Sequence, residues 1–388
     1  AMREDGWADS SLLTGNWQQA ADRLRAAHYA TQWRPMKIAR IVQESRSIRS
    51  LYLEPVDGAG LLPHLAGQHL PIRLQLGADE KPLIRTYSLS VAPSDGLYRI
   101  SVKREGRVSQ FIHDQLREGD LIEARAPAGS FTLDAQAQRP LVLLAGGIGI
   151  TPLLAMLRHL VYEGWRQQRI RPVTLFYAAR SKAERAFDRE LAELVAAAQG
   201  AIRLVRVLSD TRGAEPGVDY DTAGRIDMAL LTRYLAFDDY AFYLCGPPAF
   251  TQGLYDGLRG YNIADQRIHA EGFGPASLVR RPDQPVAATV ALPPATEPVP
   301  VLFTESLKEG RWIPGAGSLL ELAEARGLEP AFSCREGACG TCKTRLLKGA
   351  VSYLKAPTAP HGDDEVLICC AVPAQTENTA DQRLELAL

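Results

Sequence analysis

The chain has 388 residues and a net charge of −1; 46% of its residues are hydrophobic and 23% are charged. That composition is typical of a globular protein, and the length favours two or three domains over a single core. A net charge near zero creates no field that would attract nucleic acid or an anionic membrane, and no apolar run reaches the roughly 20 residues of a membrane-spanning helix.

Residues 1–35 are expected to form an N-terminal helical extension or linker, with a short amphipathic helix over 20–30. The chain opens with Ala1 before Met2, so a second interpretation is that this segment joins a fused upstream domain or a partner. We find no signal-peptide pattern, and five of the six cysteines lie between 334 and 370 rather than through the fold. Both observations favour a cytoplasmic protein.

Short alternating strands separated by turn residues dominate residues 36–137 and predict an antiparallel β-barrel interrupted by one helix, at 108–116. Residues 138–275 instead alternate strands with helices. The first strand there, 140–145, is fully apolar, which is typical of a parallel sheet covered on both faces. This pattern predicts an α/β domain.

A stretch rich in proline, alanine and arginine at 276–298 is expected to be a linker. The last domain, 299–388, begins with a strand at 299–303 and continues with a helix at 318–326. A segment dense in cysteine follows that helix. The chain is therefore expected to fold as three domains.

A glycine turn from Gly146 to Gly149 joins the first apolar strand of the α/β domain to a helix that starts at Thr151 and Pro152. Such a turn presents backbone amides and a helix N-terminus to an anion, although glycine turns also serve packing. Another strand of this domain ends in the segment 245–248, Cys-Gly-Pro-Pro. Because the carboxyl ends of strands border the ligand crevice of an open α/β sheet, we expect both segments at one crevice.

Two segments of the barrel carry groups suited to an aromatic phosphate ligand. Residues 85–88 read Arg-Thr-Tyr-Ser, which combines a phosphate-binding guanidinium, a stacking ring and a hydroxyl, although an exposed strand face would look the same. Gly106 and Ser109 head the barrel helix, where free amides and a hydroxyl could hold a second phosphate.

Cysteine spacing is the most specific signal in the chain. Cys334, Cys339 and Cys342 follow the pattern C-x4-C-x2-C, and Cys369 and Cys370 lie far downstream. Three ligands on one loop and a fourth from afar is the plant-type spacing for a 2Fe-2S cluster. Zinc and disulfides are the alternatives, but zinc ribbons pair two short knuckles instead.

Taken in order, these motifs and a Glu-Gly-Phe-Gly-Pro run at 271–275 resemble the ferredoxin–NADP reductase superfamily, fused to a C-terminal plant-type ferredoxin of β-grasp fold. This is the arrangement of oxygenase reductase components such as phthalate dioxygenase reductase and phenylacetyl-CoA epoxidase reductase. The resemblance covers residues 36–388.

By position, the resemblance implies a role for each matching residue. Those that would hold the flavin are Arg85, Thr86, Tyr87, Ser88, Val102, Lys103, Gly106, Val108 and Ser109. Those that would bind the nicotinamide dinucleotide are Gly146, Gly147, Ile148, Gly149, Thr151, Pro152, Gly246 and Pro247. Those that would border the hydride path are Cys245, Glu271 and Phe273. The cluster ligands would be Cys334, Cys339, Cys342 and Cys369, with Cys370 as a spare.

The resemblance favours FAD over FMN, although His69 stands where FAD-binding relatives often have tyrosine. It also favours NADH over NADPH. Arg180 and Lys182 follow the second strand of the α/β domain and could instead meet the extra phosphate of NADPH.

The implied function is an NAD(P)H-dependent oxidoreductase. A hydride would pass to the flavin, and single electrons would then pass through the 2Fe-2S cluster to an external protein, an oxygenase component being the expected acceptor. The alternatives are direct reduction of a small acceptor, such as a quinone, ferric chelate or nitro compound, and a redox-sensing module without turnover. In none of these does a side chain need to act as a general base.

Overall fold

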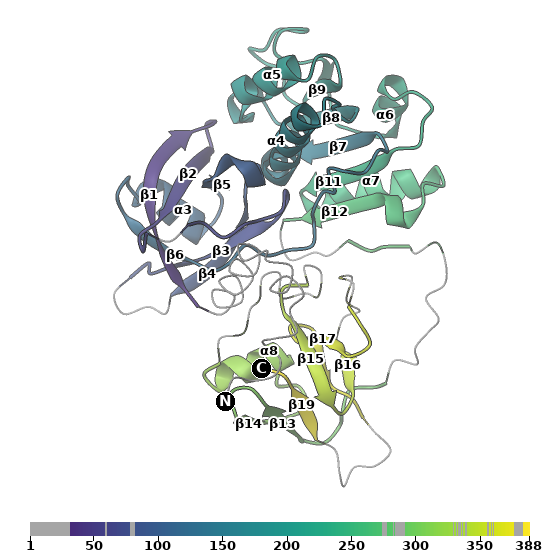
Figure 1. Ribbon diagram of the computed structural model, residues 1–388. Coiled ribbons are helices and arrows are strands. Elements are labelled where there is room, and N and C mark those ends of the chain that lie inside the picture. Colours follow the sequence, from purple (N-terminus) through teal and green to yellow (C-terminus); the bar gives the residue numbers. More distant parts are fainter. Residues whose placement is uncertain are drawn as a thin grey trace.

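In the computed structural model, three units of secondary structure follow one another along the chain (Figure 1). The residues that the structure describes are 32–58, 60–77, 82–273, 278–281, 283, 292–328, 330, 332, 335, 337, 340–354, 357, 359, 361–375 and 383–388. The helix expected at 20–30 and about half of the expected linker lie outside these residues. Within them, no helix combines the length and apolar character needed to cross a bilayer.

The first unit, called the barrel here, is a six-stranded antiparallel sheet with the order β4-β3-β6-β1-β2-β5. Its elements are β1 (Arg34–Gln43), β2 (Ile48–Pro55), β3 (His69–Leu74), β4 (Leu83–Ser88), the 3-10 helix η2 (Pro93–Asp95), β5 (Tyr98–Lys103), α3 (Arg107–Asp114) and β6 (Leu121–Ala124). Buried and exposed side chains alternate along the first half of β1, as expected for a strand with one face on a core. A bridge between Leu89 and Ile100 links the β4 end of the sheet to β5 and closes the barrel.

The second unit, called the parallel-sheet domain, has six parallel strands in the order β10-β9-β8-β7-β11-β12. Its elements are β7 (Leu141–Gly146), η3 (Gly147–Gly149), α4 (Ile150–Arg166), β8 (Val173–Ala179), η4 (Lys182–Glu184), α5 (Asp188–Ala197), β9 (Ile202–Leu208), β10 (Thr222–Ala223), α6 (Met228–Tyr234), β11 (Ala241–Gly246), α7 (Pro248–Gly260), η5 (Asp265–Arg267) and β12 (Ile268–Gly272). Every residue of β7 and β11 is buried, because apolar clusters cover both faces of the sheet.

The third unit, called the C-terminal domain, contains a five-stranded mixed sheet in the order β14-β13-β19-β15-β17 and a two-stranded ribbon of β16 and β18. Its elements are β13 (Val299–Phe303), β14 (Lys308–Trp312), α8 (Leu319–Ala325), β15 (Lys343–Lys348), β16 (Val351–Tyr353), β17 (Glu365–Leu367), β18 (Ala371–Pro373) and β19 (Leu384–Leu386). Ser318 and Glu321 form a capping box that starts α8. The predicted fold class, a barrel followed by an α/β domain and an α+β domain, is confirmed.

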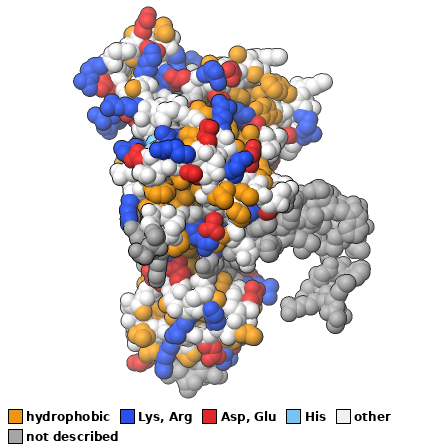
Figure 2. Space-filling view, turned by 90° about the vertical axis from the view of Figure 1, so that its left-hand side faces the viewer, with side chains coloured by type: hydrophobic (Ala, Val, Ile, Leu, Met, Phe, Trp, Pro, Cys, Tyr) orange, Lys and Arg blue, Asp and Glu red, His pale blue; other side chains and the backbone are white. Residues whose placement is uncertain are grey.

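The barrel and the parallel-sheet domain lie side by side in Figure 1, with α4 facing the barrel. They share one apolar cluster, in which Ile48 and Phe131 from the barrel side pack with residues of β7 and α4. The C-terminal domain contacts the barrel through Arg125, whose Nη1 donates to the Pro330 carbonyl at 3.2 Å. The guanidinium of Arg125 also lies over the Trp33 ring, 4.4 Å from its centroid. On the face shown in Figure 2, basic and acidic side chains are interspersed, in keeping with the net charge of −1.

Candidate functional site

The predicted glycine turn and the segment after β11 lie at the same edge of the parallel sheet. Strands β7 and β11 are neighbours, and Ala145 is in register with Cys245. The two segments approach so closely that a Cβ on Gly149 would lie 2.1 Å from the Cys245 carbonyl oxygen. Only glycine therefore allows the N-terminus of α4 to pack against the end of β11, which keeps its backbone amides at this edge of the sheet.

Thr151 takes part in the turn itself. Its hydroxyl donates to the Ile148 carbonyl at 3.0 Å, and the residue is only 2% exposed. The structure thus uses this hydroxyl to hold the first turn of α4. A dinucleotide bound at this turn would be held by the backbone amides of the turn.

Cys245, Glu271 and Phe273 meet at this edge. Cys245 is in register with Glu271 on β12, and the Phe273 amide donates to the Gly246 carbonyl at 3.4 Å. Cys245 is fully buried, and burial, together with the nearby Glu271 carboxylate, raises the pKa of its thiol. A protonated, buried thiol is suited to packing at this edge and not to acting as a nucleophile.

His69 joins this group from the barrel, across the domain boundary. Its Nδ1 lies 4.0 Å from Oε1 of Glu271, and its ring packs so close to Gly129 that a Cβ there would lie 2.8 Å from Nδ1. Burial lowers the pKa of His69 to about 4, so the imidazole is neutral at pH 7. Sequence reasoning noted His69 only as a departure from tyrosine, because nothing local signals its contact with Glu271.

His69 and Ser88 are direct cross-strand partners on β3 and β4, which puts their side chains on one face of the sheet. The Nε2 atom of His69 and the hydroxyl of Ser88 are both buried, and neither finds a hydrogen-bond partner among the described residues. Buried polar atoms are normally satisfied. These two atoms fit a ligand with hydrogen-bonding groups on its edge, as a flavin ring has.

The other predicted flavin residues lie on β4, β5 and the start of α3. Tyr87 is half-buried, and burial raises the pKa of its phenol to about 12. Arg85 is exposed and Thr86 is half-buried, Val102 is buried within β5, and Lys103 pairs with Glu105.

Gly106 is the N-cap of α3, and Val108 and Ser109 are buried in its first turn. The Ser109 hydroxyl accepts from the amides of Glu105 and Gly106, both at 2.9 Å, and donates to the Gly106 carbonyl. The hydroxyl therefore stabilises the helix start. A phosphate at this point would be held by the backbone amides that follow.

The cysteine site is described in part. Cys334 and Cys339 lie outside the described residues, whereas Cys342, Cys369 and Cys370 are all buried. The Gly337 amide donates to Sγ of Cys369 at 3.2 Å, and Gly337 has a φ of +74° that favours glycine. Sγ of Cys370 lies near the same glycine, since a Cβ added to Gly337 would be 2.6 Å from it. An amide that donates to a cysteine sulfur fits a 2Fe-2S cluster, whose sulfurs accept such bonds.

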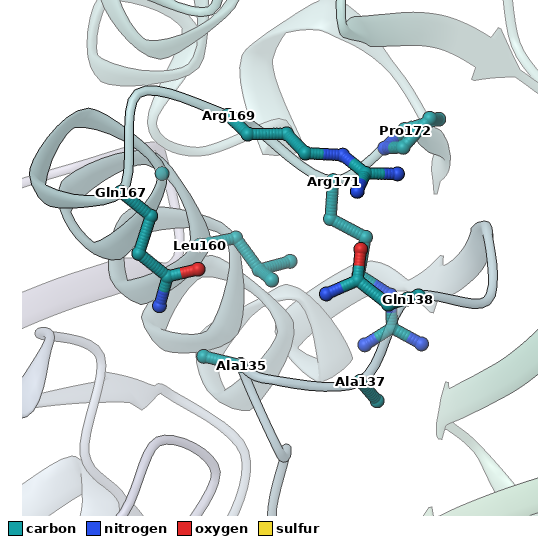
Figure 3. A pocket seen from close by; sticks show the side chains of 9 residues that line it. Ala135, Ala137, Gln138, Leu160, Gln167, Arg169, Arg171 and Pro172 are labelled. Atoms are coloured by element: carbon teal, nitrogen blue, oxygen red, sulfur yellow. The ribbon is translucent and has the colours of Figure 1, made fainter.

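A small pocket on the parallel-sheet domain lies apart from these sites (Figure 3). It is next to Pro172, which precedes β8, and so lies at the edge of the sheet opposite to the glycine turn. Arg171 is buried there, and its guanidinium donates to the carbonyls of Asp134 and Arg139. These bonds fix the segment that leads from the barrel to β7, which gives Arg171 a structural role.

Comparison with known proteins matches three domain families in chain order. An oxidoreductase FAD-binding domain matches residues 35–133, an oxidoreductase NAD-binding domain matches 143–255, and a 2Fe-2S iron-sulfur cluster binding domain matches 311–374. The predicted cofactors are confirmed at this level, with FAD favoured over FMN.

A flavohemoprotein from Bordetella pertussis is 38% identical to this chain over 253 residues. The match covers 63% of this chain and 61% of the flavohemoprotein, so the chain spans less than two thirds of that relative. The FAD/NAD-binding domain of a nitric oxide dioxygenase from Vibrio cholerae O1 biovar El Tor is 33% identical with a TM-score of 0.55, covering 62% of this chain and 99% of that one.

Phthalate dioxygenase reductase, described as a modular structure for electron transfer from pyridine nucleotides to 2Fe-2S, extends the likeness to the C-terminal domain. It is 26% identical with a TM-score of 0.54, and the match covers 92% of this chain and 98% of the reductase. The chain belongs to the ferredoxin–NADP reductase superfamily, as a member whose FAD-binding and NAD-binding domains are followed by a C-terminal 2Fe-2S domain.

Proposed function

We propose that this protein is an NAD(P)H-dependent reductase that delivers single electrons through its 2Fe-2S domain to a separate protein, an oxygenase component. Bound FAD and the cluster would supply the change from a two-electron hydride to single electrons. The chain's own residues bind these groups, set their distances and exclude water.

The observation that carries this proposal is the order of the domains, which matches phthalate dioxygenase reductase over 92% of this chain and 98% of that one. An Amycolatopsis cytochrome P450 reductase, 27% identical over 63% of this chain with a TM-score of 0.53, also serves an oxygen-activating partner by its name. The contact between Arg125 and Pro330 supports the same path, because it joins the barrel to the segment just before the cysteine loop.

Anaerobic stopped-flow absorbance with NADH and NADPH tests the proposal. We expect flavin bleaching first and cluster reduction second. A matched variant is Cys342→Ser, which removes one predicted ligand and leaves the barrel and the parallel-sheet domain untouched. It should keep flavin reduction and the reduction of ferricyanide, yet lose electron delivery to an oxygenase component.

Two outcomes would contradict the proposal. If the flavin is reduced but the cluster of the native protein never is, the relay is wrong. If Cys342→Ser supplies the oxygenase component as fast as the native protein, electrons do not leave through the cluster, and direct reduction by the flavin is the better account.

Of the two nucleotides, we infer that NADH is the donor. Lys182, which could otherwise meet the extra phosphate of NADPH, pairs with Asp219 at 2.7 Å. The Asp210 amide, at the end of the neighbouring strand, donates to the Arg180 carbonyl at 2.7 Å. This bond brings Asp210 to the strand edge where a ribose would lie, with its carboxylate accepting from Arg212 at 2.6 and 2.8 Å. An acidic residue there would also accept from the free ribose hydroxyls of NADH. Asp210→Ala should narrow the difference in kcat/KM between NADH and NADPH. If the ratio of the two kcat/KM values is unchanged, Asp210 does not select the nucleotide.

A further inference from the structure

Four charged side chains form a continuous chain of ion pairs between the barrel and the parallel-sheet domain. We call this set, Asp95, Arg158, Glu190 and Arg99, the interdomain clasp. Asp95 and Arg99 belong to the barrel, on η2 and β5, whereas Arg158 and Glu190 belong to the parallel-sheet domain, on α4 and α5. Its four members alternate in sign and sum to zero net charge.

The contacts of the clasp cross the boundary twice. Arg158 grips the Asp95 carboxylate with two bonds, Nε to Oδ2 at 2.9 Å and Nη2 to Oδ1 at 2.7 Å. Its remaining nitrogen, Nη1, donates to Oε1 of Glu190 at 2.6 Å. Arg99 then donates from Nη1 to Oε2 of Glu190 at 2.8 Å. Forked arginine bonds of this kind fix orientation as well as distance.

Little of the clasp is open to solvent. The side-chain exposure is 4% for Arg99, 11% for Asp95, 18% for Arg158 and 19% for Glu190. Burial opposes the charged form of Arg99, but the Glu190 carboxylate outweighs it and the pKa of Arg99 rises. Because ion pairs shielded from water are screened little by salt, the clasp stays formed at ordinary ionic strength.

A residue with a strained backbone, Phe187, packs its ring against the Arg99 guanidinium of the clasp. Phe187 adopts the left-handed region at φ +64°, which is uncommon for a residue with a bulky side chain, and immediately precedes α5. Its ring lies under the Arg99 guanidinium, which is 5.2 Å from the ring centroid. The same backbone turn that places this ring also starts the helix that carries Glu190. Strain of this kind persists where surrounding contacts hold it in place.

The clasp sits on the elements that carry the cofactor residues. Helix α4 begins at the glycine turn, and Arg158 follows Ile150 by eight residues, about 12 Å along the same helix. Strand β5 carries both Arg99 and the predicted flavin residues Val102 and Lys103. A rotation between the domains would therefore strain the clasp and at the same time move the two cofactor sites apart.

We propose that the interdomain clasp sets the approach of the nicotinamide to the flavin, so that its members are positioning residues for hydride transfer. This inference rests on the proposed function. The step moves one hydride, a proton with two electrons, from the reduced nicotinamide to the oxidised flavin, and the clasp exchanges neither proton nor electron. The apolar cluster shared by the two domains holds them together but is non-directional, whereas the forked ion pairs define an angle.

The test compares Glu190→Gln with the native full-length protein carrying its flavin and cluster. Glu190→Gln removes the charge that joins the two arginines. We expect the limiting rate of flavin reduction at saturating NADH to fall about 10-fold to 100-fold, since a shift near 1 Å costs that much. The apparent Kd for NADH should change less than about 2-fold, because no member of the clasp belongs to the predicted nucleotide-binding set.

A spectroscopic readout separates positioning from general damage. Stacking of nicotinamide on flavin gives a long-wavelength charge-transfer absorbance, which should weaken in Glu190→Gln while flavin content stays native. Arg158→Lys keeps the cation but loses the fork, so it should show a smaller loss of both rate and absorbance. If Glu190→Gln fails to fold, the rate and the charge-transfer absorbance of Arg158→Lys test the proposal in its place.

The matched control is Glu163→Gln on α4, the helix that carries Arg158. Glu163 pairs with Arg166 at 2.6 Å within the parallel-sheet domain, so its loss crosses no boundary and should leave rate and absorbance native. Clasp variants that behave like this control would overturn the inference, as would a raised Kd at an unchanged limiting rate. A native protein that neither NADH nor NADPH reduces would instead refute the proposed function.

Discussion

The substitution Gly149→Ala adds a single methyl group, which is expected to distort the proposed nucleotide-binding site. The added Cβ would lie 2.1 Å from the Cys245 carbonyl oxygen and 2.7 Å from the Gly246 nitrogen, and both neighbours are backbone atoms that cannot rotate away. Real Cβ contacts are essentially never under 3.0 Å, so the start of α4 and the end of β11 must separate by about 0.9 Å. Gly149 itself has a helical φ of −60°, so the effect is steric and not conformational.

The magnitude follows from that displacement. Overpacking of this kind costs about 1–3 kcal/mol of folding stability. A shift near 1 Å between the glycine turn and the strand end would lower the rate of flavin reduction by up to about 100-fold. Stopped-flow reduction by NADH measures the rate, and urea unfolding followed by circular dichroism measures the stability.

Gly253→Ala provides the control. Gly253 lies within α7, and a Cβ there would meet no atom within 4 Å. The same chemical change should therefore leave flavin reduction intact and add up to about 1 kcal/mol of stability, because alanine favours helix over glycine. If Gly149→Ala reduces its flavin as fast as Gly253→Ala does, the close approach of α4 and β11 does not shape the crevice.

Three further predictions concern the remaining sites. Burial lowers the pKa of His69 to about 4, so the unfolded chain binds a proton more readily than the folded one. About 3 kcal/mol of stability that is present above pH 6.5 should therefore be lost as the pH falls from 6.5 to 4. Urea unfolding at several pH values checks this, and a His69→Gln variant with the same pH dependence would contradict it. Since the Gly337 amide donates to Cys369, iron content and cluster absorbance should fall in Cys369→Ser and persist in Cys370→Ser; the reverse would reassign the ligand. Arg125→Ala removes the bond to the Pro330 carbonyl and should slow cluster reduction about 10-fold without slowing flavin reduction, whereas equal slowing of both steps would argue against a docking role.

Local patterns predicted the fold because they report local physics. Strand β7 is covered on both faces, so all of its residues are apolar and buried. Strand β1 is covered on one face only, so buried and exposed residues alternate along its first half. The glycine turn is readable because close approach and backbone amides demand glycine. The cysteine spacing is readable because ligand number and geometry constrain it.

Long-range pairings could not be predicted in the same way. Glu190 is 91 residues from Arg99, and each looks like an ordinary surface charge in its own segment. His69 meets Glu271 only because the barrel packs against the end of β12. The serine of the expected phosphate cap, Ser109, turned out to use its hydroxyl on neighbouring backbone, a choice that spacing alone does not reveal.

The strand order of the C-terminal domain has a consequence for how the protein is made. Strand β19, the last of the domain to be synthesised, lies in the middle of its sheet, parallel to β13 on one side and antiparallel to β15 on the other. The barrel and the parallel-sheet domain can fold during translation, whereas β13 and β15 wait for residues 384–386 before they are joined. Cys342, which leads into β15, is therefore synthesised before the strand that completes its sheet, so the C-terminal domain is the last of the three that can close.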